Sequence, residues 1–153
     1  MKGAKPSARR RAREFVLQAL YQWQIAGQSI AEIEKQFAEA EGFNKADGPF
    51  FSALFSGASS QAESTEVALQ PHLDRAWGEV SPVERGILLL AGYELISAHD
   101  VPYRVVINEA IELAKSYGGT DGHKYVNGVL DKLAAVVRAE EISFSVRTPK
   151  QIR

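Results

Sequence analysis

Hydrophobic positions recur along the chain with the spacing of an α-helix. In the first such segment, which begins near residue 9, one face carries Ala12, Phe15, Val16, Ala19, Leu20 and Trp23. Further apolar faces lie within residues 30–37, 51–69, 83–95, 110–114 and 126–137. No segment combines strict alternation with hairpin turn residues, although Ile142, Phe144 and Val146 alternate near the C-terminus. The pattern predicts an all-α protein.

Two of these segments begin with strong helix-start signals. Ser29 is followed three residues later by Glu32, and Ser81 is followed by Pro82 and then by Glu84. In such a capping box the serine accepts from a free backbone N–H and the glutamate reaches back to the serine N–H. Proline at the first helical position loses no hydrogen bond. We therefore expect two capping boxes, with helices that start just after Ser29 and Ser81.

The same pattern sets the expected domain organisation. A chain of 153 residues is long enough to bury one hydrophobic core, and no internal repeat or long linker divides it. We predict one helical domain over residues 9–139. A flexible basic segment at residues 1–8 would precede it, and a C-terminal tail at residues 140–153, also expected to be flexible, would follow it.

The composition is that of an ordinary soluble domain, with 45% hydrophobic and 24% charged residues. No uncharged apolar run approaches the roughly 18 residues that span a bilayer, and the N-terminal region lacks the apolar core of a secretory signal. The absence of cysteine excludes disulfides, iron–sulfur clusters and thiol catalysis. These features favour a cytoplasmic location.

Positive charge is concentrated at the N-terminal end. The first acidic residue is Glu14, and six of the eighteen lysines and arginines precede it: Lys2, Lys5, Arg9, Arg10, Arg11 and Arg13. The whole chain nevertheless has a formal charge of −1. A local cationic cluster on a nearly neutral protein indicates a binding site for a polyanion.

The residues of an enzyme or a metal site are not evident. The histidines at positions 72, 99 and 123 lack the spacing of zinc ligands. The glycine-rich stretch 118–122 lacks the lysine of a nucleotide-binding loop and follows a helix, so a turn between helices is favoured. Glu109 and Glu112 share one helix face and are more typical of a solvated surface than of an acid–base pair. We expect no catalytic activity, no metal and no cofactor.

Helical phasing places an aromatic ring beside the arginines of the first segment. Tyr21 points about 160° from the centre of the apolar face, almost in line with Arg10 and Leu17. Arg9 and Arg13 lie nearer the boundary of that face. Arginines neutralise phosphates, and exposed rings stack on unpaired bases. This strip therefore suits single-stranded RNA.

The start of the last helical segment forms a second candidate surface. Its apolar face centres near Leu133, which places Tyr125 at the flank and Lys124 on the solvent side. Asp121 and His123 lie beside them. The free backbone N–H groups of a helix start also favour anions. These residues are candidates for the second half of an RNA site.

Both surfaces also have a purely structural explanation. The first would be a solvated helix face with an ion pair between Arg10 and Glu14 and an incidental tyrosine. At the second, Asp121 would only cap the helix and Tyr125 would pack at the edge of the core. Trp23 lies in the middle of the apolar face, so we expect it in the core and at most partly exposed.

Four segments carry longer motifs, in the order Ala8–Glu14 (ARRRARE), Gln18–Gln24 (QALYxWQ), Val101–Lys115 (VPYRVVINEAIELAK) and His123–Asp131 (HKYVNGVLD). Together these motifs resemble the NusB family of bacterial transcription antitermination factors. The resemblance extends in collinear order from Lys5 to about Arg138, and the last two motifs are long and specific.

The resemblance implies a single domain of about seven helices in two packed bundles. It also implies binding to the single-stranded boxA element of nascent ribosomal RNA, jointly with NusE, a small-subunit ribosomal protein. The pair would join other Nus factors on RNA polymerase in the antitermination complex. The implied RNA-binding positions are Arg9, Arg10, Arg11, Arg13, Tyr21, Asp121, Lys124 and Tyr125. The implied NusE-facing surface lies on the middle helices and includes Glu84 and Tyr93.

Three residues depart from the family pattern. Tyr125 stands where the family often has phenylalanine, which keeps the stacking face and adds a hydroxyl. His72 stands where a tyrosine can add an RNA contact. Leu89 occupies a position that can carry a basic residue, which alters the expected partner surface.

Two other function classes stay open. The runner-up is a helical protein–protein interaction module whose basic end serves solubility or docking. The third is an RNA-modifying enzyme, because the helical domain also resembles one that is fused to ribosomal RNA methyltransferases. We expect no methyl-donor-binding domain in this chain. A monomer and a homodimer that buries the arginine strip are both compatible with the sequence.

Overall fold

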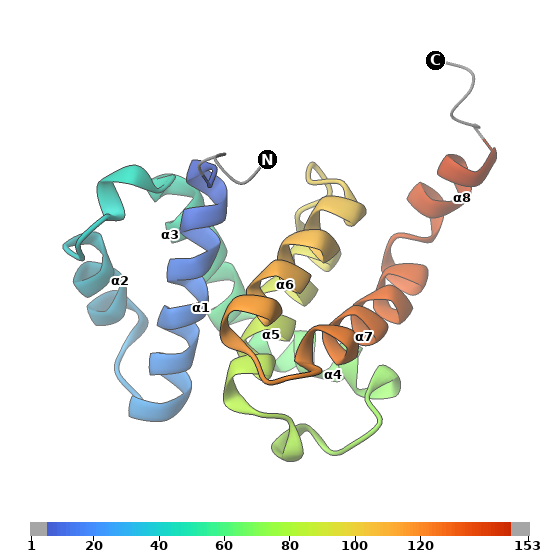
Figure 1. Ribbon diagram of the computed structural model, residues 1–153, viewed down its shortest axis with the longest axis horizontal. Helices are drawn as coiled ribbons and strands as arrows, with labels where there is room; N and C mark the ends of the chain where they lie inside the picture. Colours follow the sequence, from blue (N-terminus) through green and yellow to red (C-terminus); the bar gives the residue numbers. More distant parts are fainter. Residues whose placement is uncertain (1–5, 148–153) are drawn as a thin grey trace.

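The computed structural model describes residues 6–147. Residues 1–5 and 148–153, which include parts of both expected flexible segments, lie outside this range. The described chain contains eight α-helices, three short 3-10 helices and no strand (Figure 1). The α-helices are α1 (Ala8–Ala26), α2 (Ile30–Ala38), α3 (Gly48–Ser60), α4 (Ala62–Leu69), α5 (Pro82–Ser97), α6 (Tyr103–Tyr117), α7 (Gly122–Val137) and α8 (Ala139–Arg147). The prediction of an all-α fold of about seven helices is confirmed.

The helices form two packed groups that share α5. Helices α1, α2 and α3 pack together on one side, while α4, α6 and α7 pack around α5 on the other (Figure 1). Helix α5 also contacts α1 and α3. Its fully buried residues therefore serve both groups, and they include Ile87, Leu88, Leu90, Ala91 and Leu95. The expected arrangement in two bundles is confirmed.

Serine caps start α2 and α5 as the sequence predicts. The Ser29 hydroxyl accepts from the Glu32 N–H at 3.1 Å, and the Ser29 N–H donates to the Glu32 carboxylate at 3.4 Å. At α5 the Ser81 hydroxyl accepts from the Glu84 N–H at 3.2 Å. The Glu84 carboxylate, however, lies against Gly122 at the start of α7. Within the described residues the second capping box is thus only half formed.

A buried ion pair joins α1 to α5. Arg13 donates from Nε to Glu94 Oε1 at 3.0 Å and from Nη2 to Oε2 at 2.7 Å. Only 4% of the Arg13 side chain and 2% of the Glu94 side chain are exposed. The prediction that Arg13 belongs to an exposed strip is therefore wrong. A charge in the interior needs a close counter-charge, and Glu94 supplies it.

A second buried arginine closes the C-terminal end of α5. Arg138 directly follows α7 and donates to four backbone carbonyls at 2.7–3.1 Å, those of Glu94, Leu95, Ala98 and Val101. The last carbonyls of a helix have no partner within the helix. Arg138 supplies a partner for the Leu95 carbonyl and adds a second bond to the Glu94 carbonyl, which already accepts from the Ala98 N–H. It thereby ties the connection between α5 and α6 to the end of α7.

The same arginine anchors α8, a helix that the sequence pattern did not predict within residues 140–153. Arg138 Nη1 donates to the Glu141 carboxylate at 2.6 Å, and the Tyr103 N–H at the start of α6 donates to it at 3.0 Å. Burial raises the pKa of Glu141, but the two hydrogen bonds, with the positive charges of Arg138 and His99, hold the pKa below its usual value. Glu141 therefore fixes the first turn of α8 against α6.

Removing one member of the Arg13–Glu94 pair will destabilise the fold. The substitution Glu94→Gln leaves the Arg13 cation buried without a counter-charge. We expect the free energy of unfolding, measured by urea denaturation, to fall by about 3–5 kcal/mol. Arg9→Ala is the matched control, because the Arg9–Asp47 pair at the same end of α1 is partly exposed and such pairs contribute about 1 kcal/mol or less. Equal losses for the two variants would contradict a special role of the buried pair.

Candidate nucleic-acid interface

Arg9, Arg10 and Arg11 lie in the first turn of α1, and two of them contact acidic side chains. Arg9 Nε is 3.7 Å from the Asp47 carboxylate. The Arg9 guanidinium also lies 4.3 Å from the centre of the Phe50 ring. Arg9 is exposed, whereas Arg10 and Arg11 are half-buried. The positive charge of Arg9 is thus partly neutralised by Asp47.

Arg10 makes a two-bond ion pair with α6. Its Nε and Nη2 donate to the Glu109 carboxylate at 3.0 and 2.8 Å. The Arg10–Glu14 pair of the purely structural explanation is not formed within residues 6–147, where Arg10 pairs with Glu109 instead. The hydrogen bond to Glu109 raises the pKa of Arg10, whereas partial burial lowers it. A phosphate can reach the exposed edge of Arg10 only beside Glu109 or in its place.

Tyr21 is exposed on α1, but Leu17, one turn before it, is buried. The exposed fractions are 43% for Tyr21 and 3% for Leu17. Helix α5 covers Leu17 by a close approach at Gly86, where an added Cβ would lie 2.9 Å from Leu17 Cδ1. The prediction that Leu17 lies on the exposed strip is therefore wrong. The expected exposure of Tyr21 is observed.

The start of α7 presents an exposed ion pair and a covered ring. Lys124 Nζ lies 3.6 Å from the Asp121 carboxylate. Asp121 holds the N-cap position, although its side chain makes no capping bond within the described chain. Tyr125 is half-buried, and the Arg75 guanidinium lies 4.2 Å from the centre of its ring. One face of this candidate stacking residue is thus already occupied by a cation.

The added hydroxyl of Tyr125 is buried and, in the part of the chain that the structure describes, it has no hydrogen-bond partner. Burial raises the pKa of this phenol, Arg75 lowers it, and the carboxylates of Asp74 and Glu84 raise it. The phenol is therefore neutral at physiological pH.

The two residues expected to face NusE lie in different surroundings on α5. The Glu84 carboxylate lies against Gly122 and so belongs to the region around Asp121. Tyr93 packs onto α3, where a Cβ added at Gly57 would overlap its ring. Glu84 therefore borders the α7 surface, while Tyr93 lies at the contact between the two helix groups.

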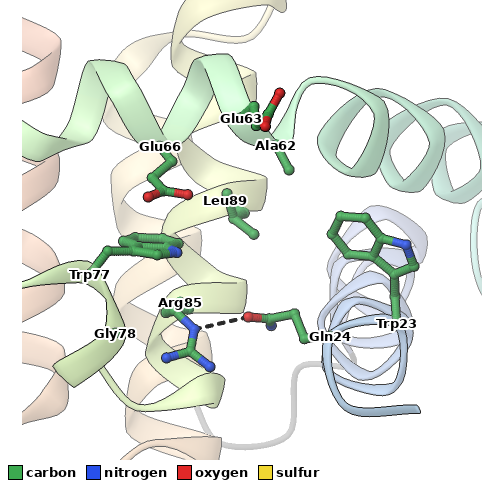
Figure 2. Close-up of a pocket in the computed structure, with 9 residues that line it drawn as sticks. All are labelled: Trp23, Gln24, Ala62, Glu63, Glu66, Trp77, Gly78, Arg85 and Leu89. Atoms are coloured by element: carbon green, nitrogen blue, oxygen red, sulfur yellow. Dashed lines mark hydrogen bonds between the residues drawn. The ribbon is translucent and has the colours of Figure 1, made fainter. Parts of the chain in front are cut away.

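A broad groove of about 780 Å³ lies between α1, α4, α5 and the 3-10 helix at Trp77–Glu79. Figure 2 shows the two indole rings on its walls and the carboxylates of Glu63 and Glu66 above it. Arg85 crosses the floor and donates from Nε to the Gln24 side-chain oxygen at 3.0 Å (Figure 2). The full lining is Trp23, Gln24, Ala62, Glu63, Glu66, Trp77, Gly78, Arg85 and Leu89.

Within residues 6–147, no group of three or more histidine, aspartate or glutamate side chains could hold a metal ion. None of the described helices combines the length and the hydrophobicity needed to cross a bilayer.

Comparison with known proteins decides the family. Residues 10–135, from the arginine row to the last turn of α7, match the model of the NusB family. The chain belongs to the NusB family. The resemblance of its four sequence motifs to that family is thereby confirmed.

Relatives in this family match almost the whole chain. The transcription antitermination protein NusB of Dechloromonas aromatica is 54% identical over 143 residues, which is 94% of this chain and 88% of that protein. The protein of the same name from Nitrosomonas europaea is 54% identical over 141 residues, which is 92% of this chain and 84% of that protein.

Solved NusB structures share the fold. The T. maritima NusB structure superimposes with a TM-score of 0.79 at 29% identity and covers 92% of this chain and 99% of its own. A crystal structure of the antitermination factors NusB and NusE in complex with double-stranded RNA gives a TM-score of 0.74 at 25% identity, with 83% of this chain and 96% of that chain covered.

The NusB-like motifs did not predict two residues at these surfaces. Arg75 lies in the irregular segment before Trp77, where no helical periodicity predicts the side on which its side chain lies. Tyr117 ends α6 just before Gly118, and the structure places it in one pocket with Tyr21. An aromatic residue directly before a glycine-rich turn is the signal that marks Tyr117 in the sequence.

Proposed function

We propose that this protein is a transcription antitermination factor that binds the boxA element of nascent ribosomal RNA together with NusE. Relatives of about half-identical sequence carry the name transcription antitermination protein NusB, and a NusB–NusE–RNA complex has a similar fold. The observation that carries the proposal is the row Arg9–Arg11 on the helix that exposes Tyr21, in a chain of this family. The protein acts in the cytoplasm by assembly with other Nus factors and RNA polymerase, not by catalysis.

Four side chains supply the charge of the proposed RNA site. Arg9, Arg10 and Arg11 come from α1, and Lys124 comes from α7. Tyr21 and Tyr125 supply rings on which unpaired bases stack. Asp121 pairs with Lys124 and holds it at the start of α7.

Arg13 has a positioning role in this proposal. Its guanidinium is buried against Glu94, so it cannot also meet a phosphate without breaking that pair. By fixing α1 on α5, the pair holds the first turn of α1 and its three arginines in place. Arg13→Ala therefore weakens RNA binding indirectly, because it removes the pair that holds α1 on α5.

The groove in Figure 2 is the proposed docking surface for NusE, in place of the positions Glu84 and Tyr93, which do not line it. Its two tryptophans and Leu89 form an apolar centre, and Glu63, Glu66 and Arg85 form a charged border. An aromatic centre with a polar rim is typical of protein–protein interfaces. With leucine at position 89, this surface is more apolar than it would be with the basic residue that can occur there.

The decisive measurement is a titration of single-stranded boxA RNA, followed by fluorescence anisotropy at several salt concentrations. Four neutralised phosphates predict a slope of log affinity against log salt near −3. Replacing Arg10 and Lys124 by alanine together leaves two cations, so affinity falls and the slope shrinks to about −1.4. Lys35→Ala is the control, because Lys35 lies on α2, outside the proposed site.

Two outcomes of this titration would contradict the proposal. No binding, with or without NusE, would remove the RNA function and favour the protein–protein interaction module. A duplex of the same sequence that binds as tightly as the single strand would contradict the stacking role of Tyr21 and Tyr125. The duplex comparison is pertinent because the similar solved complex contains double-stranded RNA.

The Arg10–Glu109 pair predicts a variant that binds RNA more tightly. Glu109→Gln releases the Arg10 guanidinium and removes a negative charge beside the phosphates. We expect affinity to rise by up to about fivefold, the equivalent of one exposed ion pair. In an Arg10→Ala background the same change should have little effect, as a double-mutant cycle will show. An equal gain in both backgrounds would mean that Glu109 acts only through its overall charge.

Filling the groove should block NusE and spare RNA. A Cβ added at Gly78 meets nothing within 4 Å, so Gly78→Leu fills the groove without disturbing the core. We expect at least a tenfold loss of NusE affinity, measured by isothermal titration calorimetry. Gly128→Leu is the matched control, since Gly128 is equally open but lies on α7 outside the groove. Unchanged NusE affinity in Gly78→Leu would remove the groove as the docking surface.

A further inference from the structure

A small pocket of about 240 Å³ lies where three helices meet beside the proposed RNA site. Helix α1 contributes Leu17, Gln18 and Tyr21, α5 contributes Val83, and α6 contributes Tyr117. Leu17 forms a buried, apolar base. The pocket is thus a short apolar recess with an aromatic ring from each of two helices.

Both rings are unusually open for aromatic side chains. Tyr21 is 43% exposed and Tyr117 is 41% exposed. Exposed aromatic surface that converges on one recess is typical of a binding site. Two tyrosines are also suited to a flat ligand, because each offers a π-face and a hydroxyl that can form a hydrogen bond.

The polar groups at the pocket favour a neutral ligand over a phosphate. Burial raises the pKa of Tyr117, the nearby Glu14 carboxylate raises it further, and the Gln18 side chain lowers it. The Glu14 carboxylate repels a phosphate group. The exposed Gln18 amide has both donors and an acceptor, which match the edge of a nucleobase.

The residues of the pocket also adjoin both charged parts of the proposed site along the chain. Leu17, Gln18 and Tyr21 follow the arginine row on α1, and Tyr117 precedes Asp121 by one short turn. Figure 1 shows the connection from α6 to α7 passing beside the lower half of α1. An RNA strand that follows α1 from the arginines toward the start of α7 would pass over the pocket.

We propose that Tyr117 and Tyr21 hold one unpaired nucleobase of the RNA in this pocket, with the Gln18 amide at its edge. The inference rests on the RNA binding proposed above and adds Tyr117 and Gln18 to the RNA-binding residues. It assigns Tyr117 a direct contact, although this residue lies outside both surfaces that the sequence pattern identifies.

The test compares Tyr117→Leu, which keeps apolar volume but removes the ring, with Tyr117→Phe, which keeps the ring. The probe is single-stranded boxA RNA, intact or with one abasic nucleotide placed at each position in turn. We expect Tyr117→Leu to weaken binding of intact RNA by about 5- to 150-fold, the effect of losing one stacked base. Tyr117→Phe should retain most of the affinity.

One abasic position should bind wild type and Tyr117→Leu equally, because the base that fills the pocket is then absent. Phe144→Leu controls for loss of an exposed ring elsewhere, since Phe144 is 64% exposed on α8. Thermal melting of all variants checks that they fold. If wild type binds RNA but Tyr117→Leu binds equally well, or no abasic position removes its defect, the pocket assignment is wrong and the RNA function stands. If wild type does not bind the RNA, both proposals fail.

Discussion

The placement of α1 and α7 against α5 depends on two buried arginines that both bind Glu94. The Glu94 side chain pairs with Arg13 of α1, and the Glu94 backbone carbonyl accepts from Arg138 at the end of α7. Because an unpaired charge in the interior is strongly unfavourable, these partners fix where α1 and α7 lie relative to α5. The two helices that carry the proposed RNA-binding residues are therefore positioned from the same turn of the same central helix.

The sequence predicted the helices well because their signals are local. Apolar periodicity, serine caps and proline at the first position act within a few residues, and α2 and α5 start where these signals predict. The prediction failed where burial depends on distant residues. Arg13 can be buried because Glu94, 81 positions further along the chain, supplies its counter-charge. Leu17 is covered because Gly86 allows α5 to approach closely. The periodicity of α1 alone does not show which residues of α5 will contact it.

The candidate site shows the same division. The exposure of Tyr21, Asp121 and Lys124 follows from helical phase, and the structure agrees with it. Helical phase could not predict the contacts that side chains of the site make with residues of other elements. They include Glu109 on Arg10 and Arg75 on Tyr125, and the joint pocket of Tyr21 and Tyr117 also depends on packing between helices. Helix α8 was missed because its anchor, Glu141, depends on a buried arginine and on the start of α6.

The Arg10–Glu109 contact also affects how the protein discriminates among polyanions. A guanidinium that already holds a carboxylate gains little from a phosphate alone, since one anion merely replaces another. Arg10 therefore adds affinity for any polyanion but little selectivity among them. Selectivity must then come from groups that interact with bases. Under the proposed RNA function, the electrostatic contacts set the position of the strand, and the aromatic side chains determine which strand is retained.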